Sequence, residues 1–222
     1  RAIEPGHLES CAPGRIVGGV ARNIAENLVR LGAPAALITA VGNDASGRSL
    51  LAHADEAGID TRGALRIDGA ASGTYTAVLD HDGEMRVALA DMAINDALTP
   101  DFFASREQQR AGAALIVADL NLPHDAVAAL LGGARSDNVP MVVVAVSEPK
   151  IDRLPQALAG LRLLILNEGE LAARVGRKLL NNADIARACD QLRKDGVQDV
   201  IVTRGAAGVS FTIPGGLSTL PP

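Results

Sequence analysis

From Ala113 onward the chain alternates short aliphatic runs with longer segments of helical periodicity, and this alternation constrains the fold most. The expected strands are Ala113–Ala118, Met141–Val146, Leu163–Leu166 and Val200–Thr203. The expected helices are Pro123–Leu131, Ile151–Leu158, Glu168–Val175 and Asn182–Lys194. Continuously apolar strands separated by helices are typical of a parallel sheet with helices on its faces. The sequence therefore predicts an α/β fold.

An amphipathic helix comes before this region and opens with Gly18-Gly19. Its apolar residues fall at positions 21, 24, 25, 28 and 31, the spacing of one buried stripe, and Gly32 is placed to end it. Arg22 and Asn23 lie off this stripe, beside a helix N-terminus whose free N–H groups favour polar or anionic partners. Two interpretations stay open: a solvated helix face, or side chains that hold a ligand in space cleared by the glycines.

A hairpin is predicted between these two parts of the chain. Thr74–Leu79 and Met85–Ala90 are strand-like runs, and the Asp82-Gly83 pair between them favours a tight turn. We expect residues 65–90 to form a small antiparallel sheet that stands off the main one.

Turn and cap residues indicate the remaining elements. Residues 1–17 are rich in turn formers and predict no first strand. We expect a strand at Ala35–Val41, a helix at Ser46–Ala57 capped by Asp44 or Ser46, and a helix opened by Thr99-Pro100. Gly208–Ile213 is expected to pair with Val200–Thr203, and 214–222 to be loop.

Composition narrows the function classes. The chain has 222 residues, 48% hydrophobic but only 2% aromatic, so we expect one domain with an aliphatic core. The net charge of −5 is scattered, which argues against nucleic-acid and membrane-surface partners, and no apolar run is long enough to span a membrane. Cys11 and Cys189 are too few for a disulfide framework, so each is expected to pack as a small hydrophobe in a cytoplasmic protein.

Polar side chains that follow the expected strands are the candidates for chemistry, because ligands of open α/β sheets gather at the carboxyl ends of the strands. Asp119 and Asn121 follow the first of these strands, where a loop satisfying its own backbone is the simpler interpretation. Asn167 and Glu170 follow another and suit either a Mg²⁺ site or a helix-capping arrangement, with capping favoured by the residues alone.

Two further candidates are weaker signals on their own. The loop Thr203-Arg204-Gly205-Ala206-Ala207-Gly208 could bring main-chain N–H groups close to a phosphate, or it could be an ordinary hairpin turn. Asp91 ends the second strand of the expected hairpin and could accept hydrogen bonds from a polyol, or shape a turn. The four histidines show no metal-ligand spacing and are expected to be structural or at the surface.

Together these motifs resemble the ribokinase-like, or PfkB-type, carbohydrate kinases over nearly the whole chain. The motifs are Gly18-Gly-x-x-x-Asn23, Gly42-x-Asp44-x-x-Gly47, Asn167-x-x-Glu170 and Thr203-x-Gly205-x-x-Gly208. Within the family the chain is most similar to the pseudouridine kinase subgroup. That similarity rests on Gly18–Ala25, Asp82-Gly83-Glu84-Met85, Asp91-Met92-Ala93-Ile94 and Val117–Asn121.

The resemblance implies a three-layer α/β/α sandwich whose antiparallel lid, about residues 65–90, closes over the substrate. The implied reaction moves the γ-phosphate of ATP to the 5′-hydroxyl of a nucleoside or sugar, with pseudouridine first. It requires Mg²⁺, and a monovalent cation is a further candidate. The implied partners are these small molecules and a second copy of the chain, bound through the lid.

The resemblance also assigns residues to roles. Its substrate-binding residues are Gly19, Arg22, Asn23, Asp91 and Asn121. Asn167 and Glu170 would order Mg²⁺ and the phosphates, with Glu170 as the metal residue. Thr203, Gly205 and Gly208 would line the ATP site.

The chain departs from the family pattern in three places. It contains no Gly-Ala-Gly-Asp box, which holds the family's base and anion hole, and residues 1–17 do not supply the family's first strand with its sugar-binding Asp. Val144-Ala145-Val146-Ser147 stands where the subgroup has Asp-Pro-Val-Ser. We therefore expect a fragment or degenerate copy, truncated at both ends, with no catalytic base and negligible activity by itself. The rival hypothesis is an inactive homologue that binds a nucleoside or dimerises.

Overall fold

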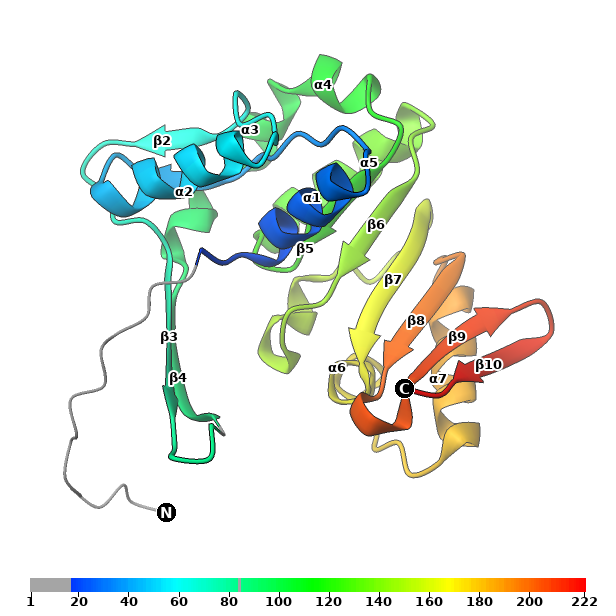
Figure 1. The fold of residues 1–222 in the computed structure, drawn as a ribbon. Coiled ribbons are helices and arrows are strands. Elements are labelled where there is room, and N and C mark those ends of the chain that lie inside the picture. The colour runs from blue at the N-terminus through cyan, green and yellow to red at the C-terminus, as the bar shows by residue number, and fades with distance from the viewer. Residues whose placement is uncertain (1–16, 84) are drawn as a thin grey trace.

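The centre of the protein is a six-stranded sheet in the order β10-β9-β8-β7-β6-β5, seen in a computed structural model that describes residues 17–83 and 85–222 (Figure 1). Strands β5 to β8 run parallel, and β9 and β10 extend the sheet as antiparallel strands at one edge. The strands are β5 (Ile116–Asp119), β6 (Met141–Val144), β7 (Leu161–Asn167), β8 (Asp199–Thr203), β9 (Val209–Ile213) and β10 (Gly216–Leu220). The four predicted parallel strands and the pairing of β9 with β8 are confirmed.

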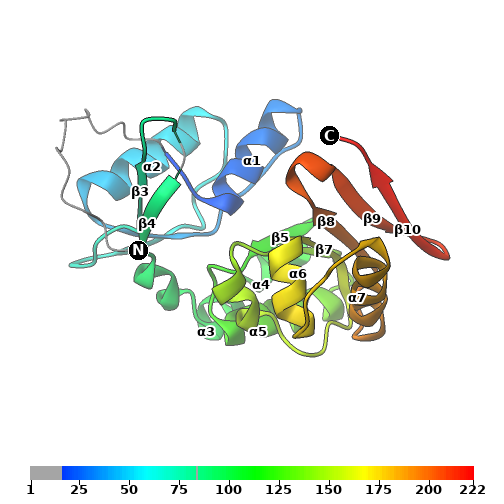
Figure 2. The same ribbon diagram turned by 90° about the horizontal axis from the view of Figure 1, so that it is seen from below.

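Helices lie on both sides of this sheet, as Figure 2 shows, so the layered α/β architecture is also confirmed. The helices are α1 (Val20–Arg30), α2 (Ala45–Glu56), α3 (Pro100–Ala104), α4 (Glu107–Ala111), α5 (His124–Ser136), α6 (Glu168–Val175) and α7 (Asn182–Lys194). Short 3₁₀ helices are η1 (Ala93–Ala97), η2 (Glu148–Arg153) and η3 (Gly205–Ala207). Helices α5, α6 and α7 cover one face, and α1 packs against β5 from the other.

The main core forms between β5–β8 and the helices α5, α6 and α7. Alternate side chains of the strands enter it, including Leu164 and Leu166 of β7, and they meet Leu171 and Leu192 of the helices. All four are at most 2% exposed. Since fully burying such a side chain contributes about 1.5–3 kcal/mol, this layer dominates the stability of the fold.

A smaller unit lies beside the main sheet and contains α1, α2 and a pair of short strands, β1 (Ala40–Gly42) and β2 (Leu65–Ile67). Asp44 caps α2 by accepting from the Gly47 N–H, as predicted. The pair β1–β2 is parallel. The expectation that residues 65–90 form one antiparallel sheet is therefore wrong for β2, because α2 lies between β1 and β2 and brings the chain back in the same direction.

The predicted hairpin is confirmed as β3 (Thr74–Leu79) and β4 (Met85–Asp91), which pair only with each other among the described strands. Figure 1 shows it projecting away from the layers. Each described residue of both strands is exposed, and large apolar side chains occupy both of its faces, among them Tyr75, Val78 and Leu89. The antiparallel part of the lid is therefore shorter than predicted.

Two other elements differ from their predictions. The predicted helix at Ile151–Leu158 is only the 3₁₀ turn η2, because Leu154 precedes Pro155 and takes an extended conformation that ends the helix. The predicted loop at 214–222 contains β10. There Pro214-Gly215, with Gly215 at φ 84°, makes the turn that joins β9 to β10.

Some expectations fall on residues that the structure does not describe. Residues 1–16, with Cys11, and residue Glu84 lie outside the described part, so the prediction of no strand at 1–17 stays a prediction. Cys189 is free and buried, as expected. No helix among the described residues is long and apolar enough to cross a membrane.

Candidate functional site

The carboxyl ends of the parallel strands gather the predicted site residues along one edge. Asn167 at the end of β7 and Thr203 at the end of β8 are direct partners in the strand register. Asp119 ends β5, two strands further along the sheet. Chain segments that are far apart in sequence thus contribute to one edge, which is the usual place for a ligand in an open α/β sheet.

Asn167 and Glu170 form a reciprocal capping box at the start of α6. The Asn167 Oδ1 accepts from the Glu170 N–H at 2.8 Å, and Glu170 Oε2 accepts from the Asn167 N–H at 2.7 Å. Glu170 is only 3% exposed, so its carboxylate is held in place by these bonds. The capping interpretation is confirmed. A further ligand role for Glu170 has to use the lone pairs that this box leaves free.

The loop after β8 is tied to the same helix. Arg204 forms an ion pair with Glu168 in the first turn of α6, and its backbone N–H donates to the Gly208 carbonyl at 2.9 Å. Gly208 has φ 83°, and a Cβ there would collide with the Leu220 carbonyl of β10, so glycine is required at this crossing. Gly205 also has positive φ, at 54°. The predicted ATP-binding loop and the predicted Mg²⁺ residues are therefore held together.

Asp119 joins α1 to the end of β5. Its Oδ2 accepts from the Ala21 N–H at 3.1 Å, and its Oδ1 accepts from the Asn121 N–H at 2.8 Å. Asp119 is 8% exposed. A buried carboxylate at the N-terminus of α1 satisfies one of its free donors and complements the helix dipole. This contact brings the first turn of α1, with Asn23, to the loop that carries Asn121.

Arg22 corrects the predicted orientation of α1. It is 7% exposed and forms a buried ion pair with Glu26 one turn along the helix, whereas Leu31 of the predicted stripe is 83% exposed. The buried face is therefore centred on Arg22, Ala25 and Glu26. The spacing rule failed because it counted only apolar side chains, and two opposite charges that pair can be buried together. The position of Glu26 four residues after Arg22 is a signal that could have found the pair.

Arg22 also reaches its neighbour Asn23. Its NH1 donates to the Asn23 Oδ1 at 2.9 Å, and Asn23 itself is exposed. The Arg22 Nε is buried with no hydrogen-bond partner among the described residues. Gly19 is the N-cap residue of α1, with φ 111°, and it provides no side-chain cap. Asn23 is thus exposed, and the buried side chain of Arg22 lies behind it.

Lys150 of η2 was not predicted, and it lies at the same edge. Its ammonium group donates to the Asn121 Oδ1, while Arg153 donates to the Asn121 carbonyl at 2.7 Å. Burial, and then the charge of Arg153, lower the pKa of Lys150, while Asp119 opposes the shift. The signal that could have found Lys150 is its place just after the strand β6, where polar residues reach the sheet edge.

Asp91 is the predicted residue least connected to this edge. It is exposed at the end of β4, and its Oδ1 accepts only from the nearby Ala93 N–H, at 3.4 Å, among the described hydrogen bonds.

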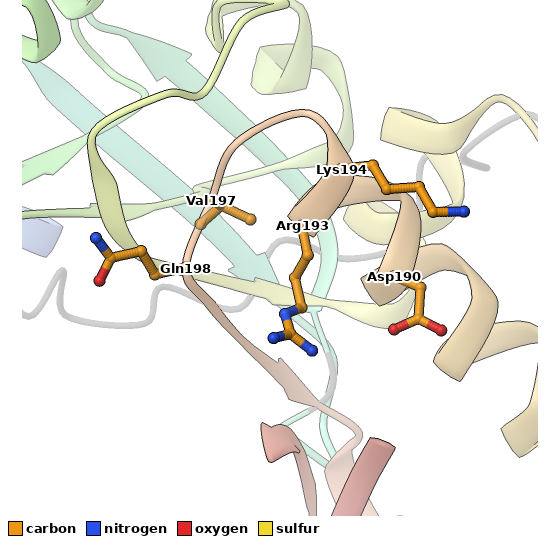
Figure 3. Close-up of a pocket in the computed structure, with 5 residues that line it drawn as sticks. All are labelled: Asp190, Arg193, Lys194, Val197 and Gln198. Carbon is orange, nitrogen blue, oxygen red and sulfur yellow. The ribbon is translucent and has the colours of Figure 1, made fainter. Parts of the chain in front are cut away.

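A shallow hollow lies at the end of α7 and contains no predicted site residue (Figure 3). It is lined by Asp190, Arg193, Lys194, Val197 and Gln198.

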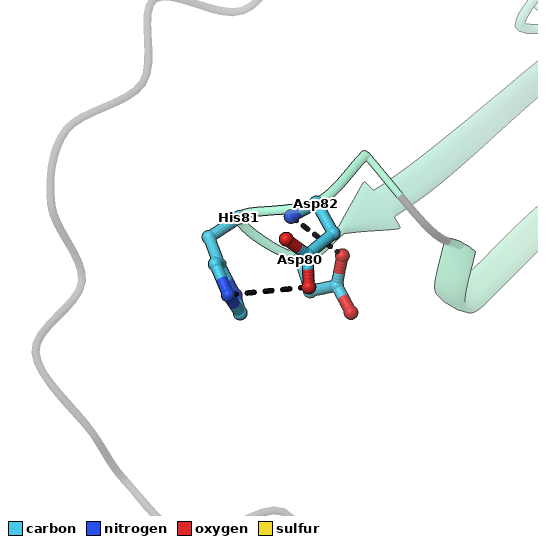
Figure 4. A group of neighbouring side chains, drawn as sticks. All are labelled: Asp80, His81 and Asp82. Carbon is cyan, nitrogen blue, oxygen red and sulfur yellow. Dashed lines mark hydrogen bonds and ion pairs between the residues drawn. The ribbon is translucent and has the colours of Figure 1, made fainter.

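The hairpin turn gathers three groups that sequence spacing did not flag. Figure 4 shows Asp80, His81 and Asp82 as neighbours in this turn, and one ligand atom of each lies within 4.8 Å of the others. The imidazole of His81 pairs with Asp82 at 3.2 Å, and Asp80 pairs with Arg86 at 2.6 Å. These internal contacts account for the cluster, so we assign it no metal.

The donor set at α6 fits a hard cation and a phosphate. The Glu148 carboxylate lies against Gly169, and Glu168 and Glu170 belong to the first turn of the same helix, so three carboxylates lie at one helix N-terminus. Oxygen ligands of this kind are those that Mg²⁺ prefers, usually shared with phosphates. Among the described residues, the N–H groups of Gly205 and Ala206 make no hydrogen bond and are the ones left to reach a phosphate.

The fold is that of an α/β protein, and the polar residues at the carboxyl ends of its parallel strands form a candidate small-molecule site. Comparison with known families gives the particular class: the model of the pfkB family of carbohydrate kinases matches residues 7–222, and the chain belongs to this family. Named relatives in this family are kinases, which are phosphotransferases.

Individual relatives and solved structures agree with this assignment. The chain is 34% identical to a pseudouridine kinase of Escherichia coli over 90% of its own length and 64% of that protein, and 32% identical to an uncharacterized sugar kinase of the same organism over 90% and 54%. A carbohydrate kinase from Agrobacterium tumefaciens superposes with a TM-score of 0.79 at 29% identity, over 96% of this chain and 68% of that one. The ribokinase of Arabidopsis thaliana, solved with ribose and ATP, superposes at 0.80 with 20% identity, over 100% and 72%, and shows the shared fold.

Proposed function

We propose that this chain is the substrate- and nucleotide-binding part of a kinase that phosphorylates the 5′-hydroxyl of a nucleoside or sugar with ATP, pseudouridine being the first candidate. The observation that carries the proposal is the single sheet edge that unites Asn23 and Asn121 with Asn167, Glu170 and Thr203. The 34% identity to a pseudouridine kinase supports the choice of substrate.

In this proposal the residues of the edge divide the work. Asn23, Asn121 and Asp91, with the backbone of Gly19, hold the hydroxyl-bearing substrate. The loop from Thr203 to Gly208 holds the nucleotide, and Glu170 and Asn167 orient its phosphates with Mg²⁺. When bound, the cation neutralises charge on the transferring phosphate, and the protein contributes positioning. The chain contains no Gly-Ala-Gly-Asp box, so we assign no base in it and expect binding with negligible phosphate transfer.

Calorimetric titration of the chain with pseudouridine, uridine, ribose and fructose 6-phosphate tests the proposal. We expect the nucleosides to bind more tightly than ribose or the sugar phosphate. Asn23→Ala should weaken nucleoside binding about tenfold, which is the effect of one well-placed hydrogen bond. Asn182→Ala is the matched control, at an exposed asparagine that begins α7, and should leave the Kd unchanged. Binding of none of the four compounds would overturn the proposal.

Nucleotide binding is tested separately. Thr203→Val should weaken binding of a non-hydrolysable ATP analogue and leave the nucleoside Kd unchanged, because Thr203 lies in the loop assigned to the nucleotide. Rapid transfer of phosphate from ATP to pseudouridine by the chain alone would show that a base exists among these residues. We also propose that the protein is cytoplasmic, because the proposed reaction uses ATP.

The exposed hairpin favours a second role, contact with another copy of the chain. Leu89 is 66% exposed and Val78 49%, on one face of β3–β4, and Tyr75 and Leu79 are more than half exposed on the other. Apolar area of this extent on an isolated hairpin is typical of an interaction surface. We expect a homodimer by light scattering. Leu89→Lys should yield monomer, whereas Leu180→Lys, at a residue 82% exposed outside the hairpin, should not.

A further inference from the structure

The two asparagines of the candidate substrate site share an unusual environment. The Asn23 Oδ1 receives a hydrogen bond from Arg22, and the Asn121 Oδ1 receives one from Lys150. Arginine and lysine side chains carry donors and no acceptor, so the amide atom that faces each of them has to be the oxygen. The orientation of both amides therefore follows from chemistry and needs no choice between O and N.

The opposite side of each amide is its NH₂ group. Neither Asn23 Nδ2 nor Asn121 Nδ2 makes a hydrogen bond to another residue within 17–83 or 85–222. Both asparagines flank the contact that Asp119 makes with Ala21 and with the Asn121 N–H. The same stretch of the sheet edge thus presents two free donor groups.

The cations behind these amides are themselves fixed. Glu26 holds Arg22 from one turn along α1 and is in turn paired with Arg30 at the surface. Lys150 is partly buried next to Arg153, which donates to the Asn121 carbonyl. An asparagine held in this way can reverse its amide only if a charged donor loses its acceptor, which disfavours the reversed orientation.

We propose that Arg22 and Lys150 are positioning residues that fix Asn23 and Asn121 with their NH₂ groups outward, so that this wall of the site selects substrates offering acceptor oxygens. The inference rests on the proposed function and specifies which hydrogen-bonding groups of the substrate the site recognises. A hydroxyl oxygen or a ring carbonyl of the substrate can accept hydrogen bonds from these NH₂ groups. A substrate that places an amino group there finds only a second donor and is rejected.

A double-mutant cycle separates positioning from direct contact. We expect Lys150→Met to raise the Kd for uridine about tenfold, the effect of one lost hydrogen bond, and Asn121→Ala to do the same. If Lys150 acts through Asn121, the double variant should match Asn121→Ala to within about twofold. Effects that multiply would show that Lys150 contacts the substrate itself and would overturn the inference. Lys194→Met, at an exposed lysine of α7, is the control and should leave the Kd unchanged.

Substrate discrimination gives a second readout. The wild-type chain should bind uridine more tightly than cytidine, in which an amino group replaces a ring carbonyl. Lys150→Met should reduce this preference, because Asn121 can then turn its oxygen outward. Arg22→Lys should keep part of the contribution of Arg22 to the preference for uridine, whereas Arg22→Met should lose that contribution. An unchanged preference in Lys150→Met contradicts the inference.

A measurement without substrate keeps the inference independent of the proposed function. In ¹⁵N-labelled protein, the side-chain NH₂ of Asn121 should show the relaxation of a rigid group, and Lys150→Met should make it mobile while Lys194→Met does not. A mobile Asn121 amide in the wild-type chain, or a rigid one in Lys150→Met, overturns the positioning role. If the amide behaves as expected but no nucleoside or sugar binds, the proposed function fails and the positioning role stands.

Discussion

The carboxylate of Asp119 accepts a hydrogen bond from the backbone N–H of Ala21 at 3.1 Å, although the two residues are 98 positions apart. This contact links the smaller unit that contains α1 to the end of the main sheet. The site depends on it, because Asn23 reaches the sheet edge only as part of α1.

Replacement of Asp119 tests this link. Asp119→Ala leaves the N–H groups of Ala21 and Asn121 without their acceptor, which should lower the free energy of unfolding by about 1–3 kcal/mol. Urea denaturation measures the change. Asp190→Ala removes an exposed carboxylate from α7 and should change stability by less than about 0.5 kcal/mol. Equal changes in the free energy of unfolding for the two substitutions would show that the hydrogen bonds of Asp119 do not stabilise the protein.

Glu170 allows capping and cation binding to be separated. Glutamine can also serve in a capping box, so Glu170→Gln should retain stability to within about 0.5 kcal/mol, whereas Glu170→Ala should lose about 1 kcal/mol. Both variants remove the charge, so both should weaken the Mg²⁺-dependent binding of an ATP analogue. Unchanged Mg²⁺ dependence in Glu170→Gln would leave Glu170 as a helix cap alone. Thermal unfolding and calorimetry provide the two measurements.

Much of the fold followed from local pattern, because strands and caps are specified by nearby residues. Aliphatic runs located β5 to β8, and the Asn167 capping box and the Thr99 cap lie where the sequence placed them. The β2 pairing could not be predicted in this way, since the direction of a strand depends on how the chain returns after α2.

The candidate site was less accessible to sequence reasoning than the fold. Asn23 and Asn121 could be named from their motifs, but the buried cations behind them could not. Arg22 was placed on a polar face because hydrophobic periodicity assigns a charged residue to solvent, and its pairing with Glu26 reverses that. Lys150 lies 29 residues after the asparagine that it contacts, and only the parallel packing of β5 and β6 brings the two together.

Acid should unfold the smaller unit partly through Asp44. Its carboxylate accepts from the Ser72 N–H at 2.8 Å, from the Gly47 N–H at 2.6 Å and from the Ser72 hydroxyl at 2.7 Å. These bonds, the Ser72 N–H first, lower the pKa of Asp44 from 3.8 to about 2. Because the folded pKa lies below the unfolded one, the stabilisation is complete well above pH 3.8 and is lost as the pH falls toward 2.

The Asp44→Asn variant isolates this contribution. The difference in free energy of unfolding between wild type and variant should be constant above about pH 5 and should shrink between pH 4 and pH 2. Urea denaturation at several pH values measures it. Subtracting the variant removes the effect of Asp60, whose pKa is also lowered to about 2 by its bonds to Arg62. A difference that stays constant down to pH 2 would contradict the assignment.

Gly208 shapes both the proposed nucleotide-binding loop and its crossing with the last strand, β10. It adopts φ 83° and ψ −140°, and a Cβ there would collide with the Leu220 carbonyl. Gly208→Ala should therefore cost about 1–3 kcal/mol in backbone strain and also displace β10 or the loop. Gly216→Ala is the control in β10, where a Cβ meets open space and φ is not positive, and it should be nearly neutral for stability.

Nucleotide affinity gives a second measurement on the same two variants. If the loop holds the nucleotide, Gly208→Ala should weaken binding of the ATP analogue even at a temperature where the variant is folded. Gly216→Ala should bind the analogue as the wild type does. Equal stability and equal nucleotide affinity in the two variants would mean that neither the crossing with β10 nor the shape of the loop matters as the structure indicates.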